Sequence, residues 1–388
     1  MPMTLTQTVV MALIQIVALL AVIMAVVPLI TFAERKVIGF VQVRLGATRV
    51  ASGRVGLTGG LNKAMWWMGK IPVLSFFRGL PVFIADGLKL VTKEDIIPEK
   101  ADKAVFILAP IICMVPAFAV FAAITFFPGP EGLFTFPASF PIVGGLKFMG
   151  YMTDINVGLL YILGVASVGV YGIVLGGWAS NSKYPLLGGL RSAAQIVSYE
   201  VPLTMSLLVP VLLAGSLSFR ELSVKLATEM PLVAIVPLFL GFFFYLTCGF
   251  AETNRVPFDL AEAETELVSG FHTEYTGMKF GFFFLAEYAN MIVVSAIASA
   301  FFLGGHYLLP FGLQSQLIHA LGAGHVLNQP SILFFIGKVG FLLFVFLWIR
   351  ATLPRYRYDQ LMHVGWKFLI PVTLVNLFIA AAVKFLWM

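Results

Sequence analysis

The chain has 388 residues, of which 60% are hydrophobic and 11% are charged, and its mean hydropathy is +0.96. Soluble domains carry about 25% charged residues, so this composition excludes a water-soluble globular protein. The net charge of +6 is too small and too dispersed to indicate a partner such as nucleic acid.

Eight segments each contain an apolar run of about 20 residues, the length that crosses a bilayer as an α-helix. The predicted spans lie at 8–32, 104–127, 156–178, 190–215, 231–251, 280–304, 331–349 and 366–387. The sequence therefore predicts an all-α polytopic membrane protein with eight transmembrane helices. We treat residues 1–388 as a single transmembrane domain.

The distribution of basic residues predicts the orientation of these spans. The loops after the first, third, fifth and seventh spans, with their flanks, hold 20 of the 25 Lys and Arg residues. The opposite side holds Lys147, Arg220, Lys225 and Lys384, and Lys338 lies within a span. Basic loops face the cytoplasm, or the matrix in mitochondria. We therefore expect a multi-pass protein of a bacterial plasma membrane, or of the mitochondrial inner membrane, with both termini outward.

The first inner loop, residues 34–103, is the longest connection between predicted spans. Within it Asp86, Lys89 and Lys93 recur at i, i+3 and i+7, and apolar residues occupy the opposite side. This pattern predicts an amphipathic helix that lies at the membrane interface.

Ionisable residues inside spans are costly and indicate function. Glu200 lies near the middle of the fourth span, and we interpret it as a proton-handling carboxyl. The alternative is a neutral glutamic acid that only hydrogen-bonds another helix. Glu287 in the sixth span and Lys338 in the seventh are similar cases, for which a structural ion pair is an equal alternative.

The strongest concentration of charge lies in the inner loop at residues 252–279. A helix opened by Pro257 and ended by Gly270 would place Asp259, Glu262 and Glu266 on one face. Three carboxylates so close repel one another, so at least one is expected to have a raised pKa.

Two other charges complete this acidic loop. Glu264 projects to the other side of the expected helix, and Arg255 is the obvious counter-ion. A solvated acidic face is the alternative interpretation. The short length of the loop between two spans, and its acidity among basic loops, favour a functional one.

Few residues of this chain suit a metal or a haem. Cys113 and Cys248 both lie inside apolar runs, so this chain alone is not expected to build an iron–sulfur or zinc site. All five histidines lie in loops or at span edges, which disfavours a haem held by two axial histidines. Any metal redox centre is expected on a partner.

The acidic loop, Glu252-Thr-Asn-Arg-Val-Pro-Phe-Asp-Leu-Ala-Glu-Ala-Glu-Thr-Glu-Leu-Val-Ser-Gly-Phe, closely resembles that of the quinone-site membrane subunit of respiratory complex I. The resemblance continues in family order through further motifs. They are Glu34-Arg-Lys-Val-Ile-Gly, Ala85-Asp-Gly-Leu-Lys-Leu-Val-Thr-Lys-Glu94, Gly177-Trp-Ala-Ser-Asn-Ser-Lys-Tyr184, Ser198-Tyr-Glu-Val201, Phe283-Phe-Leu-Ala-Glu-Tyr288 and Leu353-Pro-Arg-Tyr-Arg-Tyr-Asp-Gln-Leu-Met362.

The resemblance implies a subunit that joins a peripheral iron–sulfur and flavin arm to a proton-pumping membrane arm. Quinone would be its substrate, and this chain would hold no metal or covalent cofactor. The implied residues of the polar path into the membrane arm are Glu200, Glu252, Asp259, Glu262 and Glu287. The implied residues around the quinone chamber and its inner loops are Arg35, Asp86, Arg255, Glu264, Glu266 and Glu274.

The sequence leaves two other functions open and shows one departure from the family. The first alternative is the homologous subunit of a membrane-bound hydrogenase or ferredoxin-linked complex, and the second is a stand-alone transporter that uses Glu200 and Lys338 as an ion relay. The departure is an extra segment at about 47–78, roughly two dozen residues longer than the family pattern.

Overall fold

The computed structural model of this protein describes most of the chain. The described residues are 5–46, 63, 67, 70, 79, 82–126, 134–135, 147–148, 151–260, 269–310, 312–321 and 326–387. Most of the extra segment at 47–78 therefore lies outside the described residues.

Within the described residues, eight helices are long and apolar enough to cross a membrane, which confirms the predicted polytopic all-α fold. They comprise α1 (Leu5–Val41), α4 (Lys103–Ala119) with the 3₁₀ turn η2 (Val120–Ala123), α5 (Gly158–Ala179), α6 (Lys183–Ala214), η3 (Leu232–Ala234) with α8 (Ile235–Glu252), α10 (Gly277–Phe302), α12 (Ile332–Thr352), and α13 (Tyr358–His363) continuing through the π-helical turn η6 (Val364–Leu369) into α14 (Ile370–Trp387).

Shorter elements connect these spans. They are α3 (Val82–Thr92), the strands β1 (Phe134–Thr135) and β2 (Lys147–Phe148), α7 (Phe219–Thr228), η4 (Gly270–His272), α11 (Leu313–Leu321) and η5 (Val326–Asn328). The two strands pair antiparallel, with Phe134 opposite Phe148. The helix α3 confirms the predicted helix of the first inner loop.

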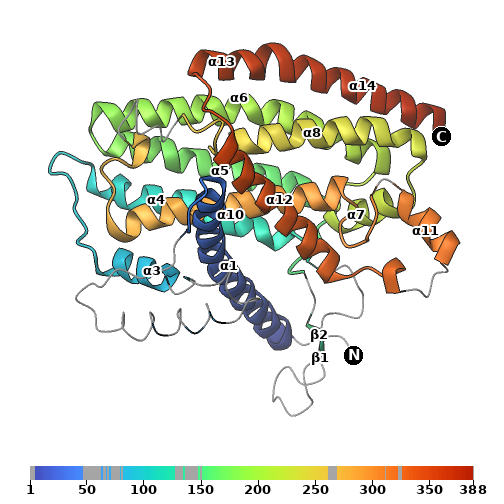
Figure 1. The fold of residues 1–388 in the computed structure, drawn as a ribbon, viewed down its shortest axis with the longest axis horizontal. Coiled ribbons are helices and arrows are strands. Elements are labelled where there is room, and N and C mark those ends of the chain that lie inside the picture. Colours follow the sequence, from blue (N-terminus) through green and yellow to red (C-terminus); the bar gives the residue numbers. More distant parts are fainter. Residues whose placement is uncertain are drawn as a thin grey trace.

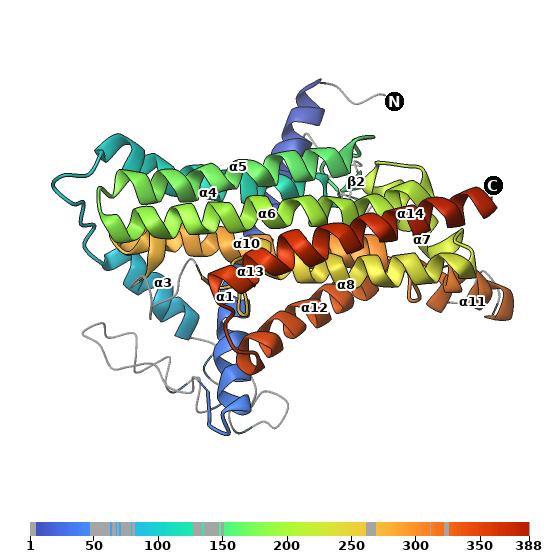
Figure 2. The ribbon, with the colours of Figure 1, turned by 90° about the horizontal axis from the view of Figure 1, so that it is seen from above.

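The spans form a bundle with two distinct ends (Figure 1). One end holds both chain termini together with α7, α11 and the β1–β2 hairpin, and we call it the terminal end. The other holds α3, and we call it the α3 end. Helices α4, α5, α6, α8 and α14 run side by side between the ends, whereas α1 is strongly inclined to them (Figures 1 and 2).

Helix α10 lies at the centre of the bundle and is the most buried of the eight spans, whereas α1 is the least buried. Small residues on α10, such as Ser295, Ala296 and Ser299, are almost fully buried. Small side chains let neighbouring helices approach closely, which compensates for the lack of a hydrophobic driving force between helices in lipid. Contacts with α10 therefore position the side chains of several spans around it.

Helix α1 continues beyond Phe32, where the sequence predicts the end of the first span. Glu34 and Arg35 consequently lie on the last turns of this helix and not in a loop. Because successive helical residues differ by about 100° in direction, Glu34 and Arg35 point to different surroundings. Glu34 is buried, whereas Arg35 remains largely exposed.

The predicted start of a helix at Pro257 is wrong, because residues 257–260 form turns and irregular backbone. Tertiary contacts take the carbonyl groups that such a helix would use. The Pro257 carbonyl accepts a hydrogen bond from the Tyr356 N–H (3.0 Å), and the Phe258 carbonyl accepts one from Gln195 Nε2 (2.8 Å). Asp259 therefore projects from an irregular segment, and residues 261–268 lie outside the described residues.

Two lysines at the terminal end donate hydrogen bonds to carbonyl groups at the ends of helices. Lys338 Nζ on α12 donates to the carbonyls of Leu303 and Tyr307, just beyond α10, and Lys384 Nζ donates to Leu213 near the end of α6 (2.7 Å). Helix C-termini carry partial negative charge, which stabilises a nearby ammonium group. Lys338 therefore binds backbone carbonyls, which differs from the structural ion pair considered for it from the sequence.

Candidate functional site

Five charged or polar side chains from four parts of the chain meet at the α3 end of the bundle. We call this set the buried charge cluster, and it consists of Glu34, Arg255, Glu287, Tyr288 and Arg350. Arg255 Nε lies 2.6 Å from Glu287 Oε1, and Arg255 Nη1 lies 3.5 Å from Glu34 Oε2. Arg350 Nη1 lies 2.5 Å from Glu34 Oε1, and the Tyr288 hydroxyl donates to Glu34 Oε2 over 2.7 Å. Two acidic and two basic groups thus form one connected network.

Arg255 is the centre of this cluster. Its side chain is 5% exposed, and its guanidinium group also lies 4.2 Å from the centre of the Tyr288 ring. A buried cation is tolerated only where opposite charges and hydrogen-bond acceptors compensate for the loss of water. Removing Arg255 would leave the carboxylates of Glu34 and Glu287 without their shared counter-ion.

The segment that carries Arg255 is held against α6. Gln195 Nε2 lies within hydrogen-bonding distance of the carbonyls of Ala251 and Phe258 (2.8 Å each) and of Asn254 Oδ1 (3.1 Å). Asn254 adopts a positive φ of 49° and donates from Nδ2 to Ser192 Oγ. These contacts fix the turn that ends α8 and direct Arg255 toward α10.

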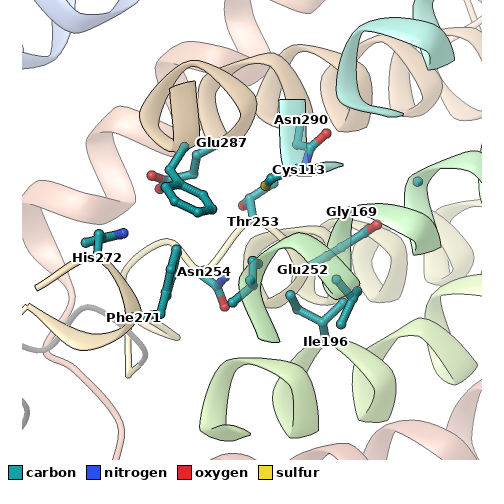
Figure 3. A pocket seen from close by; sticks show the side chains of 14 residues that line it. Cys113, Gly169, Ile196, Glu252, Thr253, Asn254, Phe271, His272, Glu287 and Asn290 are labelled. Carbon is teal, nitrogen blue, oxygen red and sulfur yellow. The ribbon is translucent and has the colours of Figure 1, made fainter. Parts of the chain in front are cut away.

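A small polar cavity lies beside the cluster, and Figure 3 shows its lining side chains. Its volume is about 50 Å³, and Glu252 from the end of α8 and Glu287 from α10 both line it. A water molecule needs roughly 10–15 Å³ of such volume and two to four polar partners. Asn254, His272 and Asn290 contribute further polar groups. The cavity therefore suits a few water molecules between two carboxyl groups.

His272 is a buried histidine of this cavity, although the sequence alone indicates an ordinary loop residue. Its imidazole packs edge-on against Phe271 and Phe280, with ring centres 4.1 and 5.5 Å apart. Burial lowers the pKa of His272 to about 4, and the negative charge of Asp259 only partly opposes this shift. The imidazole is therefore neutral at pH 7.

Asp259 forms an ion pair at the edge of the site. Its Oδ2 accepts from Arg355 Nη2 over 2.8 Å. Burial nevertheless raises the pKa of Asp259 above its ordinary value, while Arg355, Arg350 and Arg255 act in the opposite direction. The raised pKa predicted for this loop is thus present at Asp259, with burial as its largest cause.

Glu200 lies deeper in the bundle, on α6. Ser167 on α5 donates a hydrogen bond from its hydroxyl to Glu200 Oε1. Glu200 does not line the polar cavity, but it is close enough to Glu252 for the two carboxyl groups to interact electrostatically. Glu287, Glu252 and Glu200 therefore form a series that leads from the buried charge cluster into the bundle.

Arg35 and Asp86 lie apart from this series. They pair with each other over 2.7 Å between α1 and α3, and their side chains are 51% and 44% exposed. Exposed pairs of this kind contribute about 0–1 kcal/mol. Glu274 is half-buried in the segment before α10, and the predicted residues Glu262, Glu264 and Glu266 lie outside the described residues.

The segment around η4 is packed tightly against α6. A Cβ atom added at Gly188 would lie 2.7 Å from the Cα of Gly270, a distance too short for any side chain. Gly270 itself has a positive φ of 58°, which favours glycine. The backbone carrying His272 therefore touches the backbone of α6 directly.

Helix α3 is tied to the start of α10. The Thr276 hydroxyl accepts from the Ile96 N–H (3.1 Å) and donates to the Glu94 carbonyl (3.3 Å), and Lys279 Nζ lies 2.8 Å from Asp95 Oδ2. Residues 94–96, just after α3, are therefore held against the start of α10, the helix that carries Glu287.

Sequence reasoning did not select Glu34, Arg350 or Arg355 as site residues. A signal for Glu34 exists, because Val27, Ile30 and Glu34 recur at helical spacing on the buried side of α1. The partners on and after α12 could not be found in this way, since no sequence spacing indicates that they face α1 and the segment after α8.

The residues that the structure describes include no group of three or more His, Cys, Asp or Glu side chains suited to a metal ion. The site is instead built from carboxyl, guanidinium, amide, imidazole and hydroxyl groups. Such groups hold and transfer protons and bind polar parts of an organic molecule.

Comparison with known proteins relates the sequence of this chain to one family. The sequence profile of the NADH dehydrogenase family matches residues 14–381. The chain is 46% identical over 354 residues to the first H-type subunit of NADH-quinone oxidoreductase of Geobacter sulfurreducens, covering 91% of this chain and 89% of the relative. It is 44% identical to the second H-type subunit of Geobacter metallireducens, with coverage of 91% and 89%, and 43% identical to the H-type subunit of Rhodospirillum centenum, with coverage of 95% and 92%.

Proposed function

Because the chain belongs to the NADH dehydrogenase family, we propose that it is the membrane subunit of a proton-translocating NADH-quinone oxidoreductase, forming part of its quinone chamber and the start of its proton path. The names of the relatives support assignment of the chain to this enzyme. They favour that assignment over the hydrogenase-type subunit and over the stand-alone transporter. The partners are then the other subunits of that enzyme, in the iron–sulfur and flavin arm and in the membrane arm, together with the lipid bilayer.

The observation that carries the proton path is the polar cavity between Glu252 and Glu287. Moving one elementary charge against a membrane potential costs about 2.3 kcal/mol per 100 mV, so the path needs groups that change protonation state and are connected by water or hydroxyls. Glu287 and Glu252 share the cavity, and Glu200 follows on α6 with the Ser167 hydroxyl on its carboxyl. We assign these three carboxyl groups to successive positions along the proposed proton path.

Arg255 connects this path to the proposed quinone side. It lies between Glu287, which lines the cavity, and Glu34, which Arg350 and Tyr288 also contact. Quinone reduction takes up two electrons and two protons, so it changes the charge of its surroundings. A change near Glu34 or Asp259 would act on Arg255, and through it on Glu287. This shared guanidinium group is the proposed link between quinone chemistry and proton movement.

The proposal assigns the remaining predicted residues to the same end of the molecule. Arg35 and Asp86, paired between α1 and α3, would line the route by which quinone reaches the chamber from the bilayer. Glu264, Glu266 and Glu274 would belong to the chamber and its inner loops, and Glu262 to the polar path beside Asp259. Quinone is the substrate, and the redox centres that supply electrons belong to the partner arm.

The proposed location is a bacterial plasma membrane, or the inner membrane of a mitochondrion. The α3 end carries the basic loops, so it would face the cytoplasm or matrix, and the terminal end would face outward.

Substitution of Glu252 tests this function directly. Glu252→Gln retains hydrogen bonding but cannot ionise, so the assembled enzyme should lose most quinone-linked proton translocation. NADH oxidation with ferricyanide should persist, because that reaction needs only the partner arm. Glu229→Gln, a change at a carboxyl of the terminal end outside the series, is the matched control. Normal proton translocation by an assembled Glu252→Gln enzyme would contradict the assignment.

A further inference from the structure

A second cavity, separate from the polar one, lies at the terminal half of the bundle. Its volume is about 480 Å³, and it is bordered by α1 between Gln15 and Val26 and by α12 between Ile332 and Leu343. Phe121 and Ile124 after α4 border it as well, together with Phe148, Tyr151 and Met152 near the β1–β2 hairpin. Figure 1 shows α1 and α12 diverging from the central bundle beside this hairpin.

The lining of this cavity is almost entirely apolar. Of its 20 lining residues, only Gln15 and Tyr151 carry side-chain nitrogen or oxygen atoms. Apolar cavities do not hold ordered water, because a water molecule needs two to four polar partners. In a membrane-spanning protein, an apolar cavity at this position is expected to be filled by hydrocarbon chains from the bilayer.

We propose that this cavity binds one acyl chain of a phospholipid from the leaflet at the terminal end. The borders on α1 and α12 each cover 11 residue steps, which at about 1.5 Å per residue give roughly 16 Å along the helix. The hydrocarbon core of a bilayer is about 30 Å thick, so this length corresponds to about one leaflet.

Polar groups at the mouth of the cavity match the remainder of a phospholipid. Gln15 is the first lining residue from the terminal end of α1, and its amide makes no hydrogen bond to the described part of the chain, so it can donate to an ester carbonyl. Phe148 lines the cavity, and its neighbour Lys147 is exposed on the opposite face of the strand.

Lys147 also differs from the other basic residues of this end. Arg220 pairs with Asp154, Lys225 pairs with Glu221, and Lys384 donates to a helix carbonyl. Lys147 has no such partner among the residues that the structure describes. Its positive charge therefore complements a lipid phosphate at the surface.

Two glycines on α12 provide a matched test. Gly340 lines the cavity and Gly337 does not, and a Cβ added at either position meets no other atom within 4 Å. Gly340→Phe should therefore fill the cavity without a clash, whereas Gly337→Phe adds the same side chain elsewhere on the same helix.

The experiment uses the intact enzyme complex in lipid nanodiscs containing a phosphatidylglycerol that carries a diazirine at the middle of one chain. After exchange into detergent, which removes loosely held lipid, the sample is irradiated and cross-linked peptides are identified by mass spectrometry. Adducts are expected on the bordering peptides of α1 or α12 in the wild type and in Gly337→Phe. Gly340→Phe should reduce them about tenfold, which corresponds to a loss of about 1.4 kcal/mol in binding.

Further variants keep the proposal open to contradiction if Gly340→Phe fails to assemble. Gln15→Leu and Lys147→Ala should each lower the retained adduct, because they remove contacts to the ester and the phosphate. Equal labelling in all variants, or no labelling of the wild type, would overturn the proposal. Loss of labelling on addition of a long-chain quinone would overturn it too, because the cavity would then hold a quinone tail.

Discussion

Arg255 and Glu287 form a buried ion pair, with 2.6 Å between Nε and Oε1 and side chains only 5% and 12% exposed. The pair joins the turn after α8 to the central helix α10. Truncating one partner of a buried pair typically costs about 3–5 kcal/mol, because the other charge is left without compensation. The pair is therefore a sensitive point for both the structure and the proposed coupling.

Arg255→Ala is expected to abolish most quinone reductase activity in the assembled enzyme, because Glu34 and Glu287 lose their shared counter-ion. Arg255→Lys keeps the charge but not the planar group that contacts both carboxylates, and should retain only part of the activity. Quinone reduction and ferricyanide reduction by NADH are measured on the same preparations. Arg220→Ala removes a half-exposed pair at the terminal end and serves as the control. Equal loss of both activities in assembled Arg255→Ala enzyme would contradict a role at the quinone end.

Glu200→Gln should assemble but lose most coupled quinone reduction and proton translocation, since the glutamine side chain cannot ionise. Glu200→Asp should restore part of both. Ser167→Ala removes the hydroxyl that donates to Glu200 and should slow turnover more mildly. Ser206→Ala, whose hydroxyl donates to a backbone carbonyl in the same helix, is the matched control. Wild-type turnover and pumping in Glu200→Gln would show that this carboxyl is only a hydrogen-bonding group.

The orientation can be checked by cysteine labelling, because both native cysteines are buried. Cysteines introduced at the exposed positions Lys93 and Tyr356 should react with an impermeant maleimide only from the cytoplasmic side. A cysteine at Glu229 should react only from outside. Reaction of Lys93→Cys and Glu229→Cys from the same side would overturn the proposed topology.

The buried imidazole of His272 predicts a local dependence on pH. Its pKa in the folded protein is about 4, below the unfolded value of 6.5, so its contribution to stability is present above pH 6.5 and is lost as the pH falls toward 4. The difference between these two pKa values corresponds to about 3 kcal/mol at most. Protection factors for amide hydrogen exchange in segment 269–276, which are corrected for the intrinsic pH dependence of exchange, should therefore fall between pH 7 and pH 5.

His272→Asn should make the protection factors of that segment much less dependent on pH, because an amide does not take up a proton in this range. His306, whose pKa burial also lowers to about 4, lies at the terminal end of the bundle. His306→Asn should leave the pH dependence of segment 269–276 unchanged. An unchanged pH dependence in His272→Asn would exclude His272 as the group responsible.

The number of spans was predictable from the sequence because each one is a long apolar run in a medium that leaves few alternatives to a helix. The ends of the helices were less predictable. Glu34 interrupts the apolar run of α1 but not the helix, because Arg255, Arg350 and Tyr288 compensate for its charge. A prediction from hydropathy ends a span at a charged residue, because it takes no account of ion-pair partners that are distant in the sequence.

The candidate site was predictable only in part for the same reason. The carboxyls Glu200, Glu252 and Glu287 were selected because an acidic residue in or beside a span is conspicuous. The irregular backbone at Pro257 depends on hydrogen bonds from Gln195 and Tyr356, which no local pattern reveals. Burial of His272 likewise depends on α6 and α10, which border the segment from two sides.

The contact between Gly188 and Gly270 restricts how the segment carrying His272 can move. With backbone against backbone, the segment has no free distance left in the direction of α6. A displacement during turnover therefore cannot bring the segment closer to α6 at this point. A motion away from α6 would carry Phe271 and His272, which line the cavity together with Glu252 and Glu287, and its return would end at this contact. The pair of glycines thus limits how closely this wall of the cavity approaches α6.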